Sequence, residues 1–120
     1  MLDNKVVKKS DIKVSIGLNK DKVPVDIDWQ NEDNPNGPEA ERCKAVLLSF
    51  FDRKTLSTLK VDLWTADMQV HEMDQFFYET LSFMAGTYER ATQNKKLASE
   101  MRQFIQYFGE QTKIIEKSDT

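Results

Sequence analysis

Residues 12–29 have the sequence IKVSIGLNKDKVPVDIDW, and the spacing of their apolar side chains predicts the first part of the fold. Apolar residues occupy every second position over 12–18 and again over 23–29. A period of two is typical of a strand with one buried face, and the polar residues 19–22 between the two runs suit a turn. The segment therefore predicts a β-hairpin. Pro24 should start the second strand or face an edge, because proline cannot donate a ladder hydrogen bond.

The chain after this hairpin predicts one more strand and three helices. Residues 31–38 are rich in Asn, Asp, Pro and Gly and predict a loop. Apolar residues at helical spacing predict helices over about 38–52, 73–88 and 97–115, and alternation predicts a strand over 59–63. The order is ββαβαα. It indicates an α+β fold, in which three amphipathic helices cover one face of a three-stranded, mainly antiparallel sheet.

The length of 120 residues predicts a single domain over residues 1–120. We expect an ordered core over about 9–115, with short polar tails at both ends. Phe76, Leu81 and Phe104 lie on the helical stripes, so they are expected to be buried in that core.

The charge, the apolar runs and the cysteine count indicate which partners are excluded and in which compartment the protein is expected. The formal net charge is −3, so the chain has no bulk attraction for nucleic acid or anionic lipid. No apolar run approaches the roughly 18 residues that a membrane span needs, so no direct membrane insertion is expected. The single cysteine excludes an internal disulfide, and no signal peptide is recognisable. These observations predict a cytoplasmic protein.

Residue types that often act in catalysis or bind metals occur here without the partner residues that such sites need. His71 is the only histidine and is expected at the surface of a first helical turn. Cys43 lies on the apolar face of the helix predicted over 38–52 and is interpreted as a core thiol. Residues 32–37 approach a calcium-loop pattern, but Cys43 stands where a bidentate glutamate is required. We therefore expect no catalytic residue, cofactor or metal, although an enzyme with an unrecognised site remains an alternative.

The residues that remain as candidate determinants of partner binding are aromatic side chains and one loop. Trp29 and Trp64 are expected at strand ends beside loops, and exposed tryptophan is enriched in binding hot spots. Tyr78 falls away from the apolar stripe of its helix, and Phe83 lies on the flank of that stripe. Core packing is the more usual explanation for each aromatic, and partner binding is the alternative that keeps it as a candidate. The candidates are Trp29, Asp33, Asn34, Asn36, Trp64, Tyr78 and Phe83.

Five short blocks carry a resemblance to a known family. They are KSDIK at 9–13, DNPNG at 33–37, LLSF at 47–50, STLKVDLWT at 57–65 and TYERAT at 87–92. Through them the chain resembles, over about 9–108, the gliding-motility-associated GldC family of Bacteroidetes. One departure is Gln69, where the family pattern leads us to expect Thr, and it predicts a weaker helix N-cap.

The resemblance implies a cellular process without a catalytic mechanism. The family is described as small cytoplasmic proteins that accompany the gliding and type IX secretion apparatus, with no accepted enzymatic activity. The sequence thus predicts a non-enzymatic accessory protein of the gliding motility machinery, which acts through contacts with a protein of the gliding or secretion apparatus. A small secretion-chaperone-like protein that binds a segment of its partner is the alternative. Homo-oligomerisation remains open.

Overall fold

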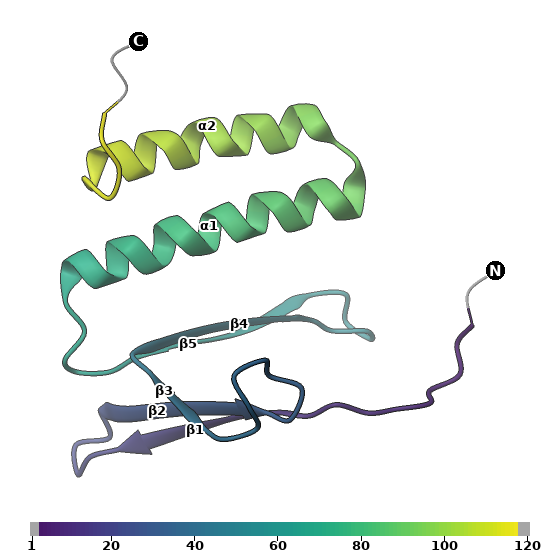
Figure 1. Ribbon diagram of the computed structural model, residues 1–120, viewed down its shortest axis with the longest axis vertical. Helices are drawn as coiled ribbons and strands as arrows, with labels where there is room; N and C mark the ends of the chain where they lie inside the picture. Colours follow the sequence, from purple (N-terminus) through teal and green to yellow (C-terminus); the bar gives the residue numbers. More distant parts are fainter. Residues whose placement is uncertain (1–2, 118–120) are drawn as a thin grey trace. The chain divides into compact units, whose positions relative to one another are not determined.

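The computed structural model describes residues 3–117, which form a sheet unit up to Met68 and a helical unit from Gln69 onward (Figure 1). The elements within these residues are β1 (Ile12–Leu18), β2 (Pro24–Asn31), β3 (Glu41–Cys43), β4 (Ala45–Phe51), β5 (Thr58–Trp64), α1 (Val70–Thr92) and α2 (Lys95–Gln111). The α+β class with antiparallel sheets is confirmed. The predicted set of three strands and three helices is wrong, because the described residues form five strands in two sheets and two helices.

The single domain predicted over residues 1–120 stays a prediction. The outermost residues of its polar tails, 1–2 and 118–120, lie outside the described residues.

The first two strands form the predicted antiparallel hairpin. Val14 pairs with Trp29 and Ile16 pairs with Ile27, so the apolar positions of both strands share one face. Ile27 is completely buried. Pro24 begins β2, as its missing N–H group predicts. The short strand β3 adds to the other side of β2 and completes a sheet in the order β1-β2-β3.

Strands β3 and β4 together occupy most of the segment that the sequence predicted as the first helix, residues 38–52, and this prediction is wrong. The run Ala45–Phe51 is apolar at nearly every position, so its local pattern fits a helix and a strand about equally well. The strand pairs over its whole length with β5, from Ala45 opposite Trp64 to Phe51 opposite Thr58. Valine and phenylalanine pack well against a neighbouring strand, and this non-local pairing decides the outcome.

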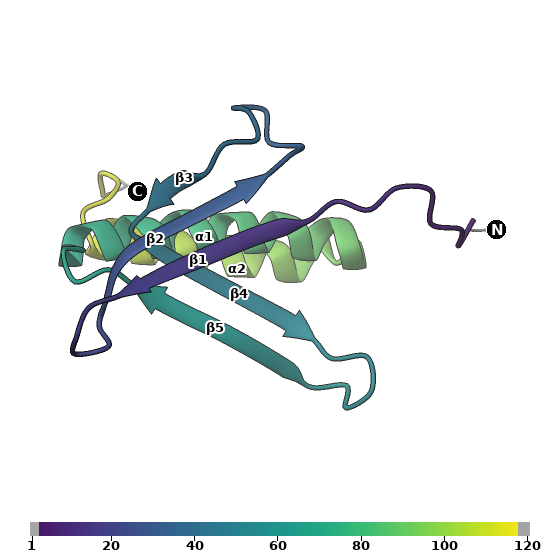
Figure 2. The ribbon, with the colours of Figure 1, turned by 90° about the horizontal axis from the view of Figure 1, so that it is seen from below.

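The chain passes from one sheet to the other at Lys44, between β3 and β4. Figure 2 shows the two hairpins crossing and meeting at one end. At this junction the Thr65 N–H donates to the Lys44 carbonyl (2.7 Å), and the Ala66 N–H donates to the Pro24 carbonyl (3.0 Å). These bonds tie the end of β5 to the start of β4 and the start of β2.

The two helices form an antiparallel hairpin (Figure 1). Its seam is made of small or branched side chains, since Ala85, Ala98 and Ile105 are all buried. Gly109 allows the closest approach: a Cβ atom built there would lie 2.6 Å from Cε1 of Tyr78. The seam therefore needs glycine at this position.

The larger aromatic residues of the helices are less covered than the sequence predicted. Phe104 is 56% exposed, so the expectation of its burial is wrong. Phe76 and Leu81 are half-buried. The apolar stripes exist as predicted, but their largest side chains are not all enclosed.

Both helices begin at a capped residue. The side chain of Asn94 accepts a hydrogen bond from the Leu97 N–H (3.0 Å) and caps the start of α2. At the start of α1 the Gln69 N–H donates to Oε1 of Glu72 (2.9 Å). This bond from a glutamate in the first turn stabilises the helix start, although Gln69 stands there in place of the expected threonine. Over residues 3–117, neither helix combines the length and apolar character needed to cross a bilayer.

Candidate functional site

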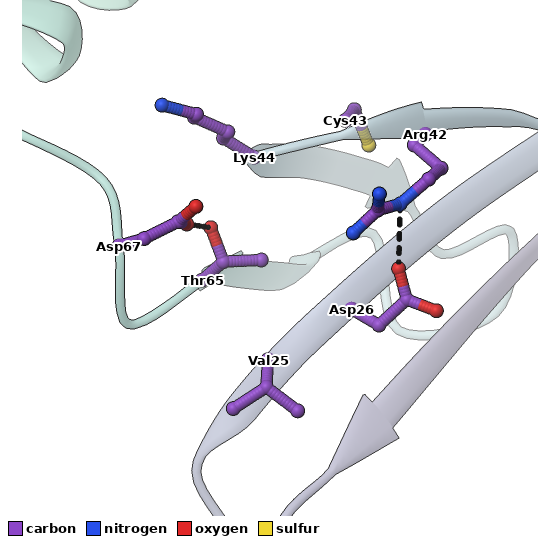
Figure 3. Close-up of a pocket in the computed structure, with 7 residues that line it drawn as sticks. All are labelled: Val25, Asp26, Arg42, Cys43, Lys44, Thr65 and Asp67. Atoms are coloured by element: carbon purple, nitrogen blue, oxygen red, sulfur yellow. Dashed lines mark hydrogen bonds and ion pairs between the residues drawn. The ribbon is translucent and has the colours of Figure 1, made fainter.

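The junction between the two sheets encloses a polar pocket of about 260 Å³ (Figure 3). It is lined by Val25, Asp26, Arg42, Cys43, Lys44, Thr65 and Asp67. Nε of Arg42 donates to Oδ1 of Asp26 (3.1 Å), and the Thr65 hydroxyl donates to Oδ1 of Asp67 (2.5 Å). The lining thus contains two basic and two acidic side chains, so its formal charges cancel.

The ionisable groups of this pocket are poorly suited to catalysis. Burial raises the pKa of the Cys43 thiol, and the nearby Asp28 carboxylate adds to this effect, so the thiol stays protonated at neutral pH. The Thr65 hydroxyl lowers the pKa of Asp67, which makes that carboxylate a weak base. Cys43 lies on β3 and is half-buried, so the predicted helical placement is wrong. The geometry favours a structural role for the pocket.

The loop after β2 is organised by its own side chains. Asp33 accepts hydrogen bonds from the Ser10 hydroxyl (2.6 Å) and Nζ of Lys8 (3.0 Å), and these contacts lower the pKa of its carboxyl group. Oδ1 of Asn34 accepts from the Asn36 N–H (3.0 Å), which closes a tight turn. The Asn34 side chain and the Asn36 backbone thus form the turn, and Asp33 holds the N-terminal segment against it.

The acidic residues of this loop do not gather with other metal-binding side chains of residues 3–117. Across the part of the chain that the structure describes, no three His, Cys, Asp or Glu residues gather closely enough to hold a metal ion. His71 lies exposed in the first turn of α1, where the sequence placed it. Nδ2 of Asn34 is buried without a hydrogen-bond partner among the described residues.

The two tryptophans differ in exposure. Trp29 is half-buried in β2, two positions before the strand ends, and faces Val14 of β1 and Glu41 of β3. Trp64 is the last residue of β5 and is 55% exposed. It lines a largely apolar hollow of about 280 Å³ with neighbours that include Val23. Trp64 therefore keeps the accessibility that a contact residue needs, and Trp29 has much less.

The two candidates on α1 point in different directions. Tyr78 is half-buried against Gly109 of α2, so it belongs largely to the helical seam. Phe83 is 74% exposed. Five helical residues turn the side chain through about 140°, which separates Phe83 from the face that meets α2. The structure thus divides Tyr78 from Phe83 and leaves Phe83 as the accessible one.

Phe83 lies in an open, mostly apolar hollow of about 500 Å³ within the helical unit. The hollow is lined by Thr80, Phe83, Met84, Thr87, Tyr88, Ala91 and Met101. Met84 is 53% exposed, so a second large apolar side chain stands at the surface beside Phe83. Contiguous exposed apolar side chains are typical of a surface that binds another protein, whereas isolated ones are common everywhere.

One face of the β4–β5 sheet is a surface that the sequence did not reveal. Cross-strand partners share a face, so the pairing places six apolar side chains together: Val46, Leu48, Phe50, Leu59, Val61 and Leu63. Phe50 is 56% exposed and Leu59 is 60% exposed. The helix predicted over 38–52 hid this face. Apolar residues at every second position from Val46 to Phe50 fit a strand, but Leu47 and Phe51 are apolar as well, so the sequence pattern does not single out this face.

Comparison with known families identifies the chain. Residues 24–114, most of the sequence, match the family model described as gliding motility-associated protein GldC-like. Comparisons with curated protein sequences and with solved structures give no significant match. The chain therefore belongs to the GldC-like family of gliding motility-associated proteins.

Proposed function

We propose that this protein is a non-enzymatic accessory component of the gliding motility machinery, which acts in the cytoplasm by binding another protein of the gliding or secretion apparatus. The family supports the process, since its description associates it with gliding motility. The observation that supports the mode of action is the apolar hollow around Phe83. A contact surface explains why large apolar side chains stay accessible although burying them would stabilise the fold.

The composition of the hollow indicates what its ligand offers. Phe83 presents a large, rigid ring, and such side chains supply much of the binding energy at protein interfaces. Met84 and Met101 add flexible thioether side chains, which adapt to the shape of an apolar partner. The complementary ligand is an apolar side chain or a short apolar segment of a protein. Contacts to such a ligand need no catalytic residue.

The test compares two exposed aromatic residues of the helical unit. Phe83→Ala removes the exposed ring of the hollow, and Tyr107→Ala removes a ring that is 58% exposed and lies outside the lining of the hollow. Both variants should keep their free energy of unfolding within about 0.5 kcal/mol, as most surface changes do. Phe83→Ala should weaken partner binding on the order of 10-fold to 30-fold, as expected for a hot-spot residue, and should reduce colony spreading.

The measurements are affinity capture from the source cell with mass spectrometry, a melting curve for each variant, and spreading of a deletion strain that carries each variant. Tyr107→Ala should capture the same proteins as the unmodified chain. Normal capture and normal spreading by Phe83→Ala would exclude the hollow as the contact surface.

The second candidate function is a small secretion-chaperone-like protein that holds a segment of its partner. The two methionines of the hollow favour it, since a flexible apolar surface tolerates different sequences. The two functions differ in what competes for the surface. Unfolded polypeptides should displace the partner from a chaperone, and only the native partner should displace it from a specific accessory protein. A competition experiment with a denatured, unrelated protein separates them.

A further inference from the structure

The outer edge of β4 carries backbone groups that the β4–β5 ladder leaves unpaired. The pairs that flank this ladder are both hydrogen-bonded: the Thr65 N–H donates to the Lys44 carbonyl (2.7 Å), and the Asp52 N–H donates to the Ser57 carbonyl (2.8 Å). Bonded and non-bonded pairs alternate along antiparallel strands. Val46, Leu48 and Phe50 therefore direct their backbone groups toward β5, and Leu47, Ser49 and Phe51 direct theirs to the outer edge.

Within residues 3–117, no backbone hydrogen bond from outside the β4–β5 ladder reaches those outward groups. A row of unpaired N–H and C=O groups is a template for another strand, and proteins usually block such an edge with charge, proline, a bulge or a short strand. The edge of β4 extends along seven residues and has none of these devices. Its sequence, AVLLSFF, contains no charged residue, no proline and no glycine.

The other strand edges of the sheet unit are protected in these usual ways. β1 carries Lys13 and an irregularity in register between Gly17 and Leu18. β3 is only three residues long. β5 carries Lys60 and Asp62, which form an ion pair with each other (2.7 Å). β4 is thus the exception among the edges, and this contrast indicates that it is paired in the functional state.

We propose that β4 pairs with β4 of a second copy of this chain, antiparallel about a two-fold axis at Leu48. This register pairs all seven residues of each strand. It sets Leu47 opposite Ser49 of the second copy, so the outward N–H and C=O groups of both residues meet as a bonded pair. Leu48 then stands opposite Leu48 of the second copy as a non-bonded pair, because its backbone N–H and C=O groups already point toward β5. The strand is complementary to itself without any like-charge contact.

The same register also matches side chains. Val46 stands opposite Phe50 of the second copy, and aromatic and β-branched side chains directly opposite each other stabilise a sheet. The paired strands form a four-stranded sheet in the order β5-β4-β4-β5. Its apolar face is twice as wide as that of one copy, because the six apolar side chains of each copy lie on the same side. Closed two-fold pairing also leaves no free β4 edge that could extend into a fibre.

The first experiment blocks one outer edge at a time in the full chain. Ser49→Pro places proline on the outer edge of β4, where the lost N–H serves no bond to β5. Lys60→Pro is the matched control, since Lys60 stands directly opposite Ser49 and points its backbone groups to the outer edge of β5. Analytical ultracentrifugation over the micromolar range should give twice the 14.0 kDa chain mass for the unmodified protein and for Lys60→Pro. Ser49→Pro should sediment as a monomer with unchanged circular dichroism.

The second experiment introduces no proline, so it does not depend on whether β4 still folds with a proline in it. In a Cys43→Ser background, Leu48→Cys places two thiols on the two-fold axis. The Cα atoms of a non-bonded pair are about 4.5 Å apart, within the range of a disulfide. Mild oxidation should link most of this variant into a covalent dimer. Val61→Cys is the control, because it lies on the same face but three strand spacings of about 4.8 Å from its counterpart, and it should not cross-link.

Three results would overturn the proposal. One is a monomer at every concentration. A second is a dimer that survives Ser49→Pro or that is lost equally with Lys60→Pro, since either would place the interface elsewhere. The third is equal cross-linking of Leu48→Cys and Val61→Cys. None of these results bears on the hollow around Phe83, which is tested by partner capture.

Discussion

The helical hairpin α1–α2 and the strand hairpin β4–β5 are held together by different interactions. The helical hairpin has a seam in which Ala85, Ala98 and Ile105 are buried and Gly109 lies against Tyr78. The strand hairpin has no fully buried residue along either strand. Its two strands are joined by an unbroken backbone ladder, and one of its faces carries six apolar side chains, three from each strand.

This difference shows which groups of each hairpin remain available to contact another protein. Two helices adhere only through their side chains, because the backbone groups of each helix are satisfied within it. Two strands adhere through their backbone groups, so their side chains remain available for other contacts. The helices use their small residues for the seam and expose large ones such as Phe83, and β4 exposes both a face and an edge.

The largest effect that tests this comparison is expected in the helical seam. Ile105→Ala should lower the free energy of unfolding by about 2–5 kcal/mol, because it leaves a cavity between the helices. Leu59→Ala truncates a residue that is 60% exposed on β5 and should cost about 0.5 kcal/mol. Urea titrations of both variants measure the difference. Equal losses would show that the β4–β5 face is as buried as the seam and would remove the contrast.

An intermediate effect, with opposite signs, is expected for the two helical glycines. Gly109→Ala brings a Cβ atom to 2.6 Å from Cε1 of Tyr78 and 2.9 Å from Cγ1 of Ile115, so overpacking should cost roughly 1–3 kcal/mol. Gly86→Ala meets only Nη1 of Arg90, at 3.5 Å, and should stabilise the protein by about 0.4–1 kcal/mol because alanine restricts the unfolded chain. Melting temperatures should move down and up, respectively. A stable Gly109→Ala variant would mean that the seam is looser than its geometry indicates.

The smallest effect is expected where a surface ion pair links the helices. Nη1 of Arg102 lies 2.6 Å from Oε1 of Glu89, and this contact lowers the pKa of Glu89. A carboxyl whose pKa is lowered by folding stabilises the fold above its unfolded value, and that contribution disappears as pH falls through the folded value. Glu89→Gln should therefore be less stable than the unmodified chain at pH 7, and the gap should close in acid, below the ordinary glutamate value of 4.5.

The control for this ion pair is Glu100→Gln, which removes the charge of an exposed glutamate on α2. Thermal melts of the three proteins across the acid range measure the gap. A gap between Glu89→Gln and the unmodified chain that stays constant with pH would show that the glutamate contributes through packing and not through its charge.

Part of the candidate site was visible in the sequence because it depends on one helix or one strand. Phe83 and Trp64 were named as candidate contact residues, with core packing as the competing explanation, and they are 74% and 55% exposed. Tyr78 was named as a candidate for the same reason as Phe83, but it is half-buried and packs against Gly109 of the other helix. A single helix pattern shows the direction of a side chain but not what lies opposite, so the role of Tyr78 needed the fold.

The sequence by itself determined the β1–β2 hairpin, the third predicted strand and both described helices. Each of these elements has one apolar face, and alternation or helical spacing shows such a face within a single strand or helix. Only the tertiary structure decided that Ala45–Phe51 is a strand. Seven nearly uniform apolar residues satisfy either period, and the ladder with Thr58–Trp64 is the interaction that chooses between them. The same pairing creates the apolar face and the unprotected edge of β4, because a face and an edge exist only once two strands are joined.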